Sequence, residues 1–380
     1  MSSDVASGAT QPISNLSRRQ PPVVLVYRIG QLGDALVTIP AIKAIRARHP
    51  DSIFVLLTDR QPSERGWVSS WDVLGAIGVF ADVVYYEPAN SIRAIVKVTY
   101  RLARTLRDHR PDIVYNLAPV RNRWQRIRDR AFFVGLVGSP EYRTPPPLSH
   151  RQIRNSSGIL EPVEAEWRRL MRVTPTPVES ANAALLVQVV DVLSALSELC
   201  VAGGKATGPK IAIGPGSKMR AKRWPLESFV AVIELLHVRL PDYEFLIFGD
   251  ANEMDVGEQL VDRLGQFCIN LAGRLSVQES AALLARCSLY IGNDTGTMHL
   301  AAAVGCRCVA IFSSRDSPGL WEPFGPGHRV LRTDPPCAGC MLETCTAHSL
   351  VCLTSISADE VTSAALNILR VLDSEIVAND

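Results

Sequence analysis

Apolar and polar positions alternate in blocks along the first half of the chain. Short runs rich in β-branched apolar residues predict strands at residues 23–29, 53–58, 83–86 and 113–117. Helix-like stretches separate these runs, and the first of them covers about residues 34–48. A strand–helix–strand rhythm of this kind predicts a parallel sheet that is covered by helices on both faces.

The rhythm breaks over residues 138–180, which are rich in proline and are interpreted as loops and a linker, and it restarts at residue 210. The second half predicts strands at 211–214, 243–248, 288–292 and 308–312, and helices at 226–239, 253–265, 276–286, 297–304 and 358–372. Two α/β units therefore follow each other. Because ligands of parallel sheets bind beyond the carboxyl ends of the strands, we expect the site in the cleft between the two units.

Length and composition agree with two domains. The chain has 380 residues, of which 47% are hydrophobic and 21% are charged. We expect a flexible tail at 1–21, an N-terminal domain at 22–180, a linker helix and connection at 181–208, and a C-terminal domain at 209–380. The tail lacks the apolar core of a secretory leader. The apolar stretch 183–201 is interrupted by polar residues and predicts an amphipathic helix and no membrane span.

The net charge of +2 is distributed unevenly. Residues 1–200 carry 25 Lys and Arg against 18 Asp and Glu, a net of +7, and the remainder carries a net of −5. A basic front half is typical of a chain with an anionic partner, whereas general binding of nucleic acid is disfavoured. The nine cysteines, several of them in apolar runs, favour a reducing, cytoplasmic location.

The first candidate motif follows the first predicted strand. Residues 28–36 read RIGQLGDAL, in which Gly30 and Gly33 permit a tight turn and Asp34 stands at the start of a helix. Asp34 is interpreted either as a helix cap or as a carboxylate at the cleft that accepts a proton. The spacing is not the G-x-G-x-x-G of a dinucleotide site.

Two further motifs predict an anion site in the second half. Residues 218–223 place four cations between a glycine-rich turn and a helix start, where free amides and positive charge coincide. Residues 292–303 lead from a strand end through small polar residues into an apolar helix, whose first amides would point toward a phosphate. Asp294, at the start of this turn, is interpreted as a partner of sugar hydroxyls or as a helix cap.

Together these motifs resemble the bacterial heptosyltransferase family, glycosyltransferase family 9. The resemblance covers about residues 23–370 and implies a GT-B fold, with two Rossmann-like domains facing across a cleft and the nucleotide-sugar donor held by the C-terminal one. The motifs are GDAL and the following proline at 33–40, KRWP at 222–225, FGDANE at 248–253, LAG at 271–273 and NDTGTMHL at 293–300.

The resemblance implies a role for individual residues. Asp34 is implied as the general base for the acceptor hydroxyl, and Lys222 as the cation that meets donor phosphate and sugar oxygens. Glu253 is implied to bind the ribose, Leu271 to lie near the base, and Asp294 to contact the donor. The implied diphosphate turn consists of Thr295, Gly296, Thr297 and His299.

The implied reaction is an inverting transfer of a sugar, by family default a heptose, from a donor such as ADP-heptose to a lipopolysaccharide or other glycan. Breaking a glycosyl–phosphate bond builds negative charge on the departing diphosphate, which a lysine and helix amides stabilise. No Asp-x-Asp occurs in the sequence, in agreement with transfer that requires no metal cofactor. A nucleotide-sugar epimerase and a non-catalytic family member remain as alternatives.

A basic stretch between residues 93 and 130 holds eleven Lys and Arg against three acids. Arg93, Lys97, Arg101 and Arg104 recur at helical spacing and predict one basic face. That face is interpreted either as an ordinary solvated surface or as the contact for a phosphorylated glycolipid acceptor or an anionic inner-membrane surface, to which the chain would be peripheral. Nucleic acid is not predicted, because no recognition motif accompanies the charge.

A cysteine-rich loop precedes the last helix. Cys337, Cys340, Cys345 and Cys352 provide four thiols within sixteen residues, enough for a tetrahedral structural metal such as zinc or iron. The alternative is that the thiols are reduced and simply packed. Some relatives of the resembled family hold iron in such a loop.

Overall fold

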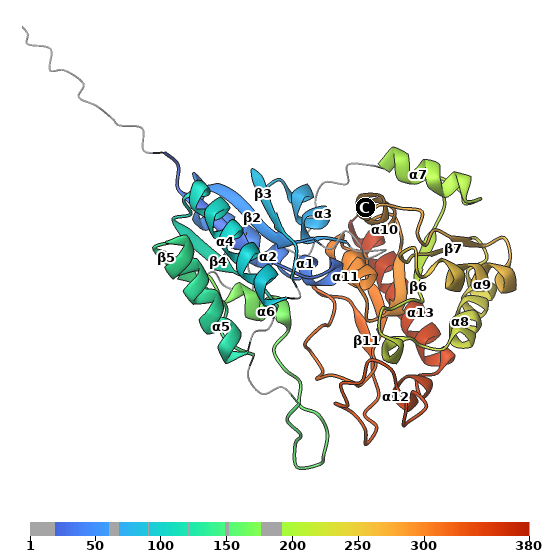
Figure 1. Cartoon of the computed structure of the whole chain (residues 1–380). Helices are drawn as coiled ribbons and strands as arrows, with labels where there is room; N and C mark the ends of the chain where they lie inside the picture. Colours follow the sequence, from blue (N-terminus) through green and yellow to red (C-terminus); the bar gives the residue numbers. More distant parts are fainter. Residues whose placement is uncertain are drawn as a thin grey trace, which may run out of the picture.

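The computed structural model describes residues 20–60, 68–89, 91–119, 122–148, 152–175 and 192–379. It consists of two lobes, each built on one parallel sheet, with the front lobe in blue to green and the rear lobe in yellow to red (Figure 1). The strand orders are β3-β2-β1-β4-β5 in front and β11-β10-β9-β6-β7-β8 behind. This is the predicted α/β architecture of two Rossmann-like domains, and it is a GT-B fold.

The front lobe is formed by the helices and strands of the first half of the chain. They are β1 (Val23–Tyr27), α1 (Leu32–Leu36), α2 (Ile39–Arg48), β2 (Ile53–Asp59), α3 (Ser70–Leu74), β3 (Asp82–Tyr86), α4 (Ile92–His109), β4 (Ile113–Asn116), α5 (Arg123–Arg130), the π-helix η2 (Ala131–Val137), β5 (Glu141–Arg143) and α6 (Glu166–Met171).

The rear lobe repeats the plan with a longer C-terminal helix. Its elements are α7 (Val192–Val201), β6 (Lys210–Gly214), α8 (Leu226–Arg239), β7 (Glu244–Ile247), α9 (Met254–Leu264), β8 (Cys268–Asn270), α10 (Val277–Leu284), β9 (Leu289–Asn293), α11 (Gly296–Ala303), β10 (Cys308–Ile311), β11 (Arg329–Leu331), α12 (Val351–Thr354) and α13 (Ala358–Asn379).

The predicted helix at 34–48 is wrong in one respect, because the structure divides it into α1 and α2. Pro40 causes the division: it lacks an N–H to donate to the preceding turn, but it is tolerated at the start of a new helix. The shorter α1 places its N-terminus, and with it Asp34, at the centre of the molecule (Figure 1).

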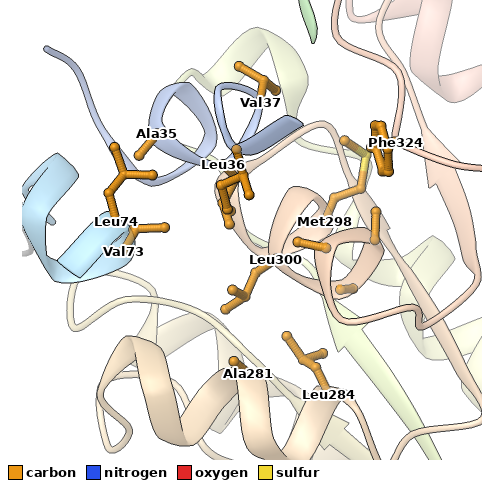
Figure 2. Close-up of a cluster of buried hydrophobic side chains, with 14 of the residues drawn as sticks. Ala35, Leu36, Val37, Val73, Leu74, Ala281, Leu284, Met298, Leu300 and Phe324 are labelled. Carbon is orange, nitrogen blue, oxygen red and sulfur yellow. The ribbon is translucent and has the colours of Figure 1, made fainter. Parts of the chain in front are cut away.

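An apolar core joins the lobes (Figure 2). Ala35 and Leu36 of α1 belong to the same cluster of buried side chains as Met298 and Leu300 of α11, and all four are at most 1% exposed. Burial of apolar surface on this scale stabilises one relative placement of the two lobes.

The proline-rich segment also contacts the rear lobe. The N–H of Val163 donates to the carbonyl of Pro318 and that of Glu166 to the carbonyl of Leu320, each at 2.9 Å. The predicted domain limits remain predictions. Residues 1–19 of the predicted tail and 181–191 of the predicted linker lie outside the described residues. Within the described ranges, no helix has the length and apolar character that crossing a membrane requires.

Candidate functional site

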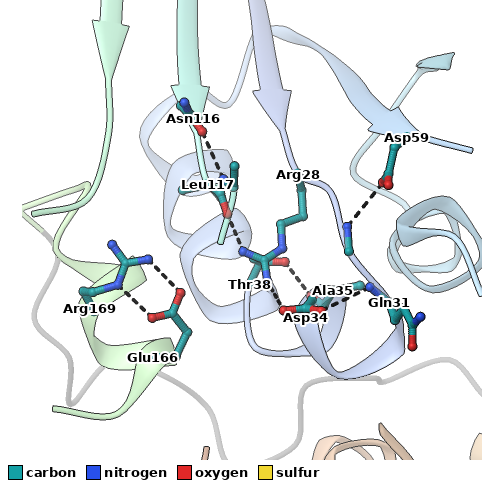
Figure 3. Close-up of polar contacts among 12 residues, drawn as sticks. Arg28, Gln31, Asp34, Ala35, Thr38, Asp59, Asn116, Leu117, Glu166 and Arg169 are labelled. Carbon is teal, nitrogen blue, oxygen red and sulfur yellow. Dashed lines mark hydrogen bonds and ion pairs between the residues drawn. The ribbon is translucent and has the colours of Figure 1, made fainter. Parts of the chain in front are cut away.

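Asp34 lies in the first turn of α1, shortly after β1 (Figure 3). Its carboxylate accepts the backbone N–H of Gln31 at 3.2 Å, and its side chain is 31% exposed. Gly30 has φ +114°, a conformation that side chains rarely adopt, and a Cβ there would lie 2.7 Å from the Asp34 carboxylate. Asp34 thus caps α1 through Gln31 and keeps exposed carboxylate surface, and its role as a proton acceptor stays a prediction.

Arg28 forms an ion pair with Asp34, and the sequence analysis gave Arg28 no role. It is fully buried, with Nη2 3.4 Å from Asp34 Oδ1, and Nη1 donates to the carbonyl of Leu117 (Figure 3). A buried guanidinium requires partners of this kind. The sequence feature that could have indicated a role for Arg28 is its place directly after the apolar run that forms β1.

The turn around Asp34 packs directly on the start of α11 in the rear lobe. A Cβ on Gly33 would lie 3.0 Å from Cδ2 of His299, and a Cβ on Gly296 would lie 3.1 Å from Cβ of Leu32. A Cβ at either glycine would therefore require the neighbouring side chain to move by a few tenths of an ångström. The two lobes meet where the sequence placed the base and the diphosphate turn.

Charges from both lobes converge on His299, which is 6% exposed. Burial lowers the pKa of His299 to about 4, while the negative charges of Asp294 and Asp34 act to raise it and Lys222 acts to lower it further. The imidazole is therefore neutral at physiological pH. That all three groups act on one ring shows that the structure brings Asp34, Lys222 and Asp294 together.

Lys222 and Asp294 contact each other. Their Nζ and Oδ2 atoms are 2.6 Å apart, and their side chains are only 15% and 11% exposed. The sequence motifs assigned each of them separately to the donor, whereas the structure joins them as a mostly buried ion pair. A donor phosphate would therefore compete with Asp294 for this lysine.

Asn293 fixes the loops around this ion pair, and sequence reasoning gave it no role. Its Nδ2 donates to the carbonyls of Pro215 at 2.7 Å and Gly216 at 3.2 Å, and its Oδ1 accepts the N–H of Trp224 at 3.0 Å. The residue is fully buried. One amide thus positions the glycine-rich turn relative to the loop that carries Lys222.

A cavity of about 350 Å³ opens between the lobes beside the Asp34 turn. Gln31 and Leu32 line it from the front lobe. Of the predicted donor residues, Glu253, Thr295, Gly296 and Thr297 line it from the rear lobe, together with the cations Lys218 and Arg223. The volume and the mixture of apolar and charged walls are typical of a small-molecule site.

The other predicted residues lie outside the cavity lining. Asp34, Lys222 and Asp294, with the neutral His299 beside them, lie next to it. Leu271 is 1% exposed, packs in the core and is not among the residues that line the cavity. Apolar residues to which the motifs gave no role line the wall instead: Phe248, Leu275, Val277 and Leu300.

Glu253 is the most strongly perturbed carboxyl group of the cavity. Burial, and then the nearby charge of Asp250, raise its pKa to about 7, against the lowering effects of the Asp250 N–H and of Arg223. Its Oε2 accepts that N–H at 3.0 Å. A Cβ on Gly216 would lie 2.1 Å from Glu253 Cδ, so glycine leaves the room that this side chain occupies.

The predicted basic face exists on α4. Its four cations are exposed and none lines the cavity between the lobes: Arg93, Lys97, Arg101 and Arg104. A membrane or acceptor role for these residues thus depends on a surface that is separate from the cavity.

The four cysteines of the predicted metal site lie close together, but they are not arranged to hold a metal ion. Cys337, Cys340, Cys345 and Cys352 line one cavity of about 20 Å³, together with His348. Within the part of the chain that the structure describes, no three Cys, His, Asp or Glu side chains are arranged to hold a metal ion. The thiols are close together, but the side chains as placed are not a ligand set.

Comparisons with known proteins agree on one family. The family model for glycosyltransferase family 9 (heptosyltransferase) matches residues 183–350. Over these residues the chain is similar to glycosyltransferase family 9. This agrees with the family that the motifs resemble.

Two curated relatives show how far the similarity extends. Lipooligosaccharide heptosyltransferase 2 of Haemophilus influenzae is 34% identical over 129 residues, 33% of this chain, and the match spans only 36% of the relative. Lipopolysaccharide heptosyltransferase 3 of Escherichia coli is 26% identical over 77% of this chain and 83% of its own length. The match with the higher identity, to the Haemophilus influenzae protein, thus spans only about a third of this chain and about a third of that relative.

A solved family 9 structure shares the fold. The E. coli ADP-heptose lps heptosyltransferase II superposes with a TM-score of 0.66 and 20% identity, covering 93% of this chain and 99% of that one. At this identity the likeness shows the GT-B fold, so the chemistry has to be argued from the site.

Proposed function

We propose that this protein is a family 9 glycosyltransferase that moves a sugar from a nucleotide-diphosphate donor to a hydroxyl of a glycan. One observation carries the proposal: a cavity between the lobes has the Asp34 turn of the front lobe on one side and the Thr295–Thr297 turn of the rear lobe on the other. A transferase needs this arrangement, because donor and acceptor must meet in a shared space.

The donor binds the rear lobe in this proposal. The start of α11 offers free amides to the diphosphate, and Lys218 and Arg223 add positive charge from the cavity wall. Glu253 accepts hydrogen bonds from the ribose. Phe248, Leu275 and Val277 provide apolar surface for the base.

Transfer proceeds by a single displacement in this proposal. The acceptor oxygen attacks the anomeric carbon as the bond to the diphosphate breaks, and Asp34 takes the hydroxyl proton, so that the sugar is transferred with inversion. The Lys222 ammonium shares its charge between Asp294 and the departing diphosphate, and so neutralises part of the negative charge that develops there. Because amides and cations stabilise the leaving group, the residues present need no catalytic metal.

The donor and acceptor classes follow from the relatives. The names of the relatives include ADP-heptose, lipooligosaccharide and lipopolysaccharide, so we propose ADP-heptose as donor and a lipopolysaccharide-type glycan as acceptor. Thermal shift with ADP, UDP and GDP tests the nucleotide, and mass spectrometry of donor plus acceptor tests transfer. A product without acceptor would favour an epimerase, and nucleotide binding with no product from any pair would favour a non-catalytic member.

Nucleotide binding is predicted to depend on Glu253 ionisation. With its pKa raised to about 7, Glu253 is mostly protonated at pH 6 and mostly ionised at pH 8. Since the carboxylate is the better acceptor for ribose hydroxyls, binding should tighten up to about tenfold over this range. Calorimetry with ADP at both pH values measures the change.

Glu253→Gln is the control for that prediction. The amide keeps the shape but has no proton to lose, so only the titration of ADP itself should remain in the variant. Equal pH dependence in the two proteins would contradict the role of Glu253.

The location and the anionic surface are part of the proposal. All nine cysteines are free, which supports a reducing cytoplasm.

We propose that the basic face of α4 contacts an anionic inner-membrane surface, with each cation contributing about 1 kcal/mol. Changing Arg93, Lys97 and Arg101 to Gln should release the protein from anionic vesicles in a sedimentation assay. Equal sedimentation of native protein with neutral and anionic vesicles would contradict the contact.

A structural metal at the cysteine loop is retained as a proposal. The four thiols surround one small cavity, and thiolates suit zinc or iron. Elemental analysis of protein purified without chelator should find about one metal per chain, and Cys340→Ser should lower that amount and the melting temperature. If the native protein contains no metal and Cys340→Ser has the same melting temperature as native, the thiols are packed without a metal.

A further inference from the structure

A second cavity, of about 520 Å³, lies in the front lobe and shares no lining residue with the cavity between the lobes. It is bounded by α4, by η2 and by the ends of β1–β3, and its volume falls in the range of small-molecule pockets. Its interior is mainly apolar, with walls that include Leu57, Ile95, Val98, Leu102, Phe132 and Leu136.

Four of the polar side chains that line this cavity engage each other in pairs, while Glu87 and Thr99 also line it. The hydroxyls of Tyr27 and Tyr86 are 3.0 Å apart, and Arg128 Nη2 is 2.8 Å from Asp129 Oδ1. An occupant therefore has mainly apolar surface to contact. Because hydrophobic attraction depends on the area removed from water, an alkyl chain fits this wall better than a sugar or a nucleotide.

The outside of α4 points to the source of such a chain. Ile92, Val96 and Tyr100 recur every four residues and are 82%, 62% and 68% exposed. The cations Arg93 and Lys97 follow two of them in the sequence, so an apolar stripe runs beside a basic one. Helices with this pattern lie in the interface of anionic bilayers.

We propose that this cavity takes one acyl chain of an anionic bilayer lipid, while the cations of α4 bind the phosphate headgroups around it. Ile92, Val96 and Tyr100 do not line the cavity, and an exposed apolar stripe outside it favours a bilayer as the source. The inference deepens the proposed membrane contact and rests on it. It adds an inserted chain that would fix the front lobe, and with it the cleft, relative to the membrane.

Binding of soluble n-alkyl phosphates to the full-length protein tests the cavity directly. Butyl, hexyl, octyl and decyl phosphate, each below its micelle concentration, should bind about fourfold tighter for each added methylene until the cavity is filled. Calorimetry measures these affinities without any sugar donor. Affinity that does not change with chain length would overturn the inference.

Two substitutions on α4 separate the cavity from the surface. Thr99 lines the cavity, whereas Val96, also β-branched, is exposed outside it. Thr99→Trp should abolish the chain-length dependence and reduce sedimentation with anionic vesicles several-fold, and Val96→Trp should leave both in place. Retained dependence in Thr99→Trp overturns the cavity, and unchanged sedimentation of that variant overturns the bilayer lipid as its occupant.

A photoactivatable decyl phosphate gives a second measurement on native protein, in case Thr99→Trp fails to fold. Crosslinks should fall in peptides that contain residues 95–102 and 131–136, which line the cavity. Crosslinks confined to other peptides would overturn the inference. Because none of these measurements involves a nucleotide, a failure here is distinguishable from a failure of the proposed sugar transfer.

Discussion

Asp34→Asn is expected to lower the rate of sugar transfer by about 10²–10⁴-fold, the usual contribution of a general base. The amide keeps the size of the side chain and can still accept the N–H of Gln31, but it cannot take the acceptor proton. The donor is proposed to bind the rear lobe, so nucleotide affinity should stay within about twofold of native. Product formation by mass spectrometry and ADP binding by calorimetry measure the two effects.

A matched control separates catalysis from helix capping. Asp72 stands at the same position in α3 as Asp34 in α1, and its carboxylate accepts the backbone N–H of Ser69 at 2.8 Å. Asp72 does not line the cavity between the lobes. Asp72→Asn should therefore lose a similar amount of stability with little change in transfer rate. If both variants keep full activity, Asp34 is only a cap.

The sequence predicted the sheets of both lobes because their central strands are long, buried and rich in β-branched residues. The strands it missed are β5, β8 and β11, each of three residues and each at or beside a sheet edge. Runs this short carry no periodicity that separates a strand from a loop. Their pairing is decided by the neighbouring strand, which is a tertiary contact.

The candidate site was predictable where one segment carries the chemistry. The turns at Asp34 and at Thr295–Thr297 both appear where the motifs placed them, at the meeting of the two lobes. Arg28 and Asn293 were missed because their partners, Leu117 and Pro215, are distant in sequence. Hydrogen bonds of this kind leave no spacing pattern.

The pairing of Lys222 with Asp294 was likewise invisible in the sequence, and it changes what the lysine substitution should do. Lys222→Met removes the charge that is proposed to stabilise the leaving diphosphate, for which about 10²–10³-fold in turnover is expected. It also leaves Asp294, formerly 2.6 Å from the ammonium, as an uncompensated negative charge beside the diphosphate. Nucleotide binding should therefore weaken together with turnover.

A double-mutant cycle distinguishes these two contributions. Adding Asp294→Asn to Lys222→Met removes the repulsion, so ADP affinity should recover in part while turnover stays low. Arg220→Met is the control and should behave as native. Arg220 is an exposed cation of the 3-10 helix η4 (Arg220–Lys222), which also contains Lys222, and it does not line the cavity. Native ADP affinity in Lys222→Met would place this lysine outside the donor site, since removing a cation that meets the diphosphate must weaken binding.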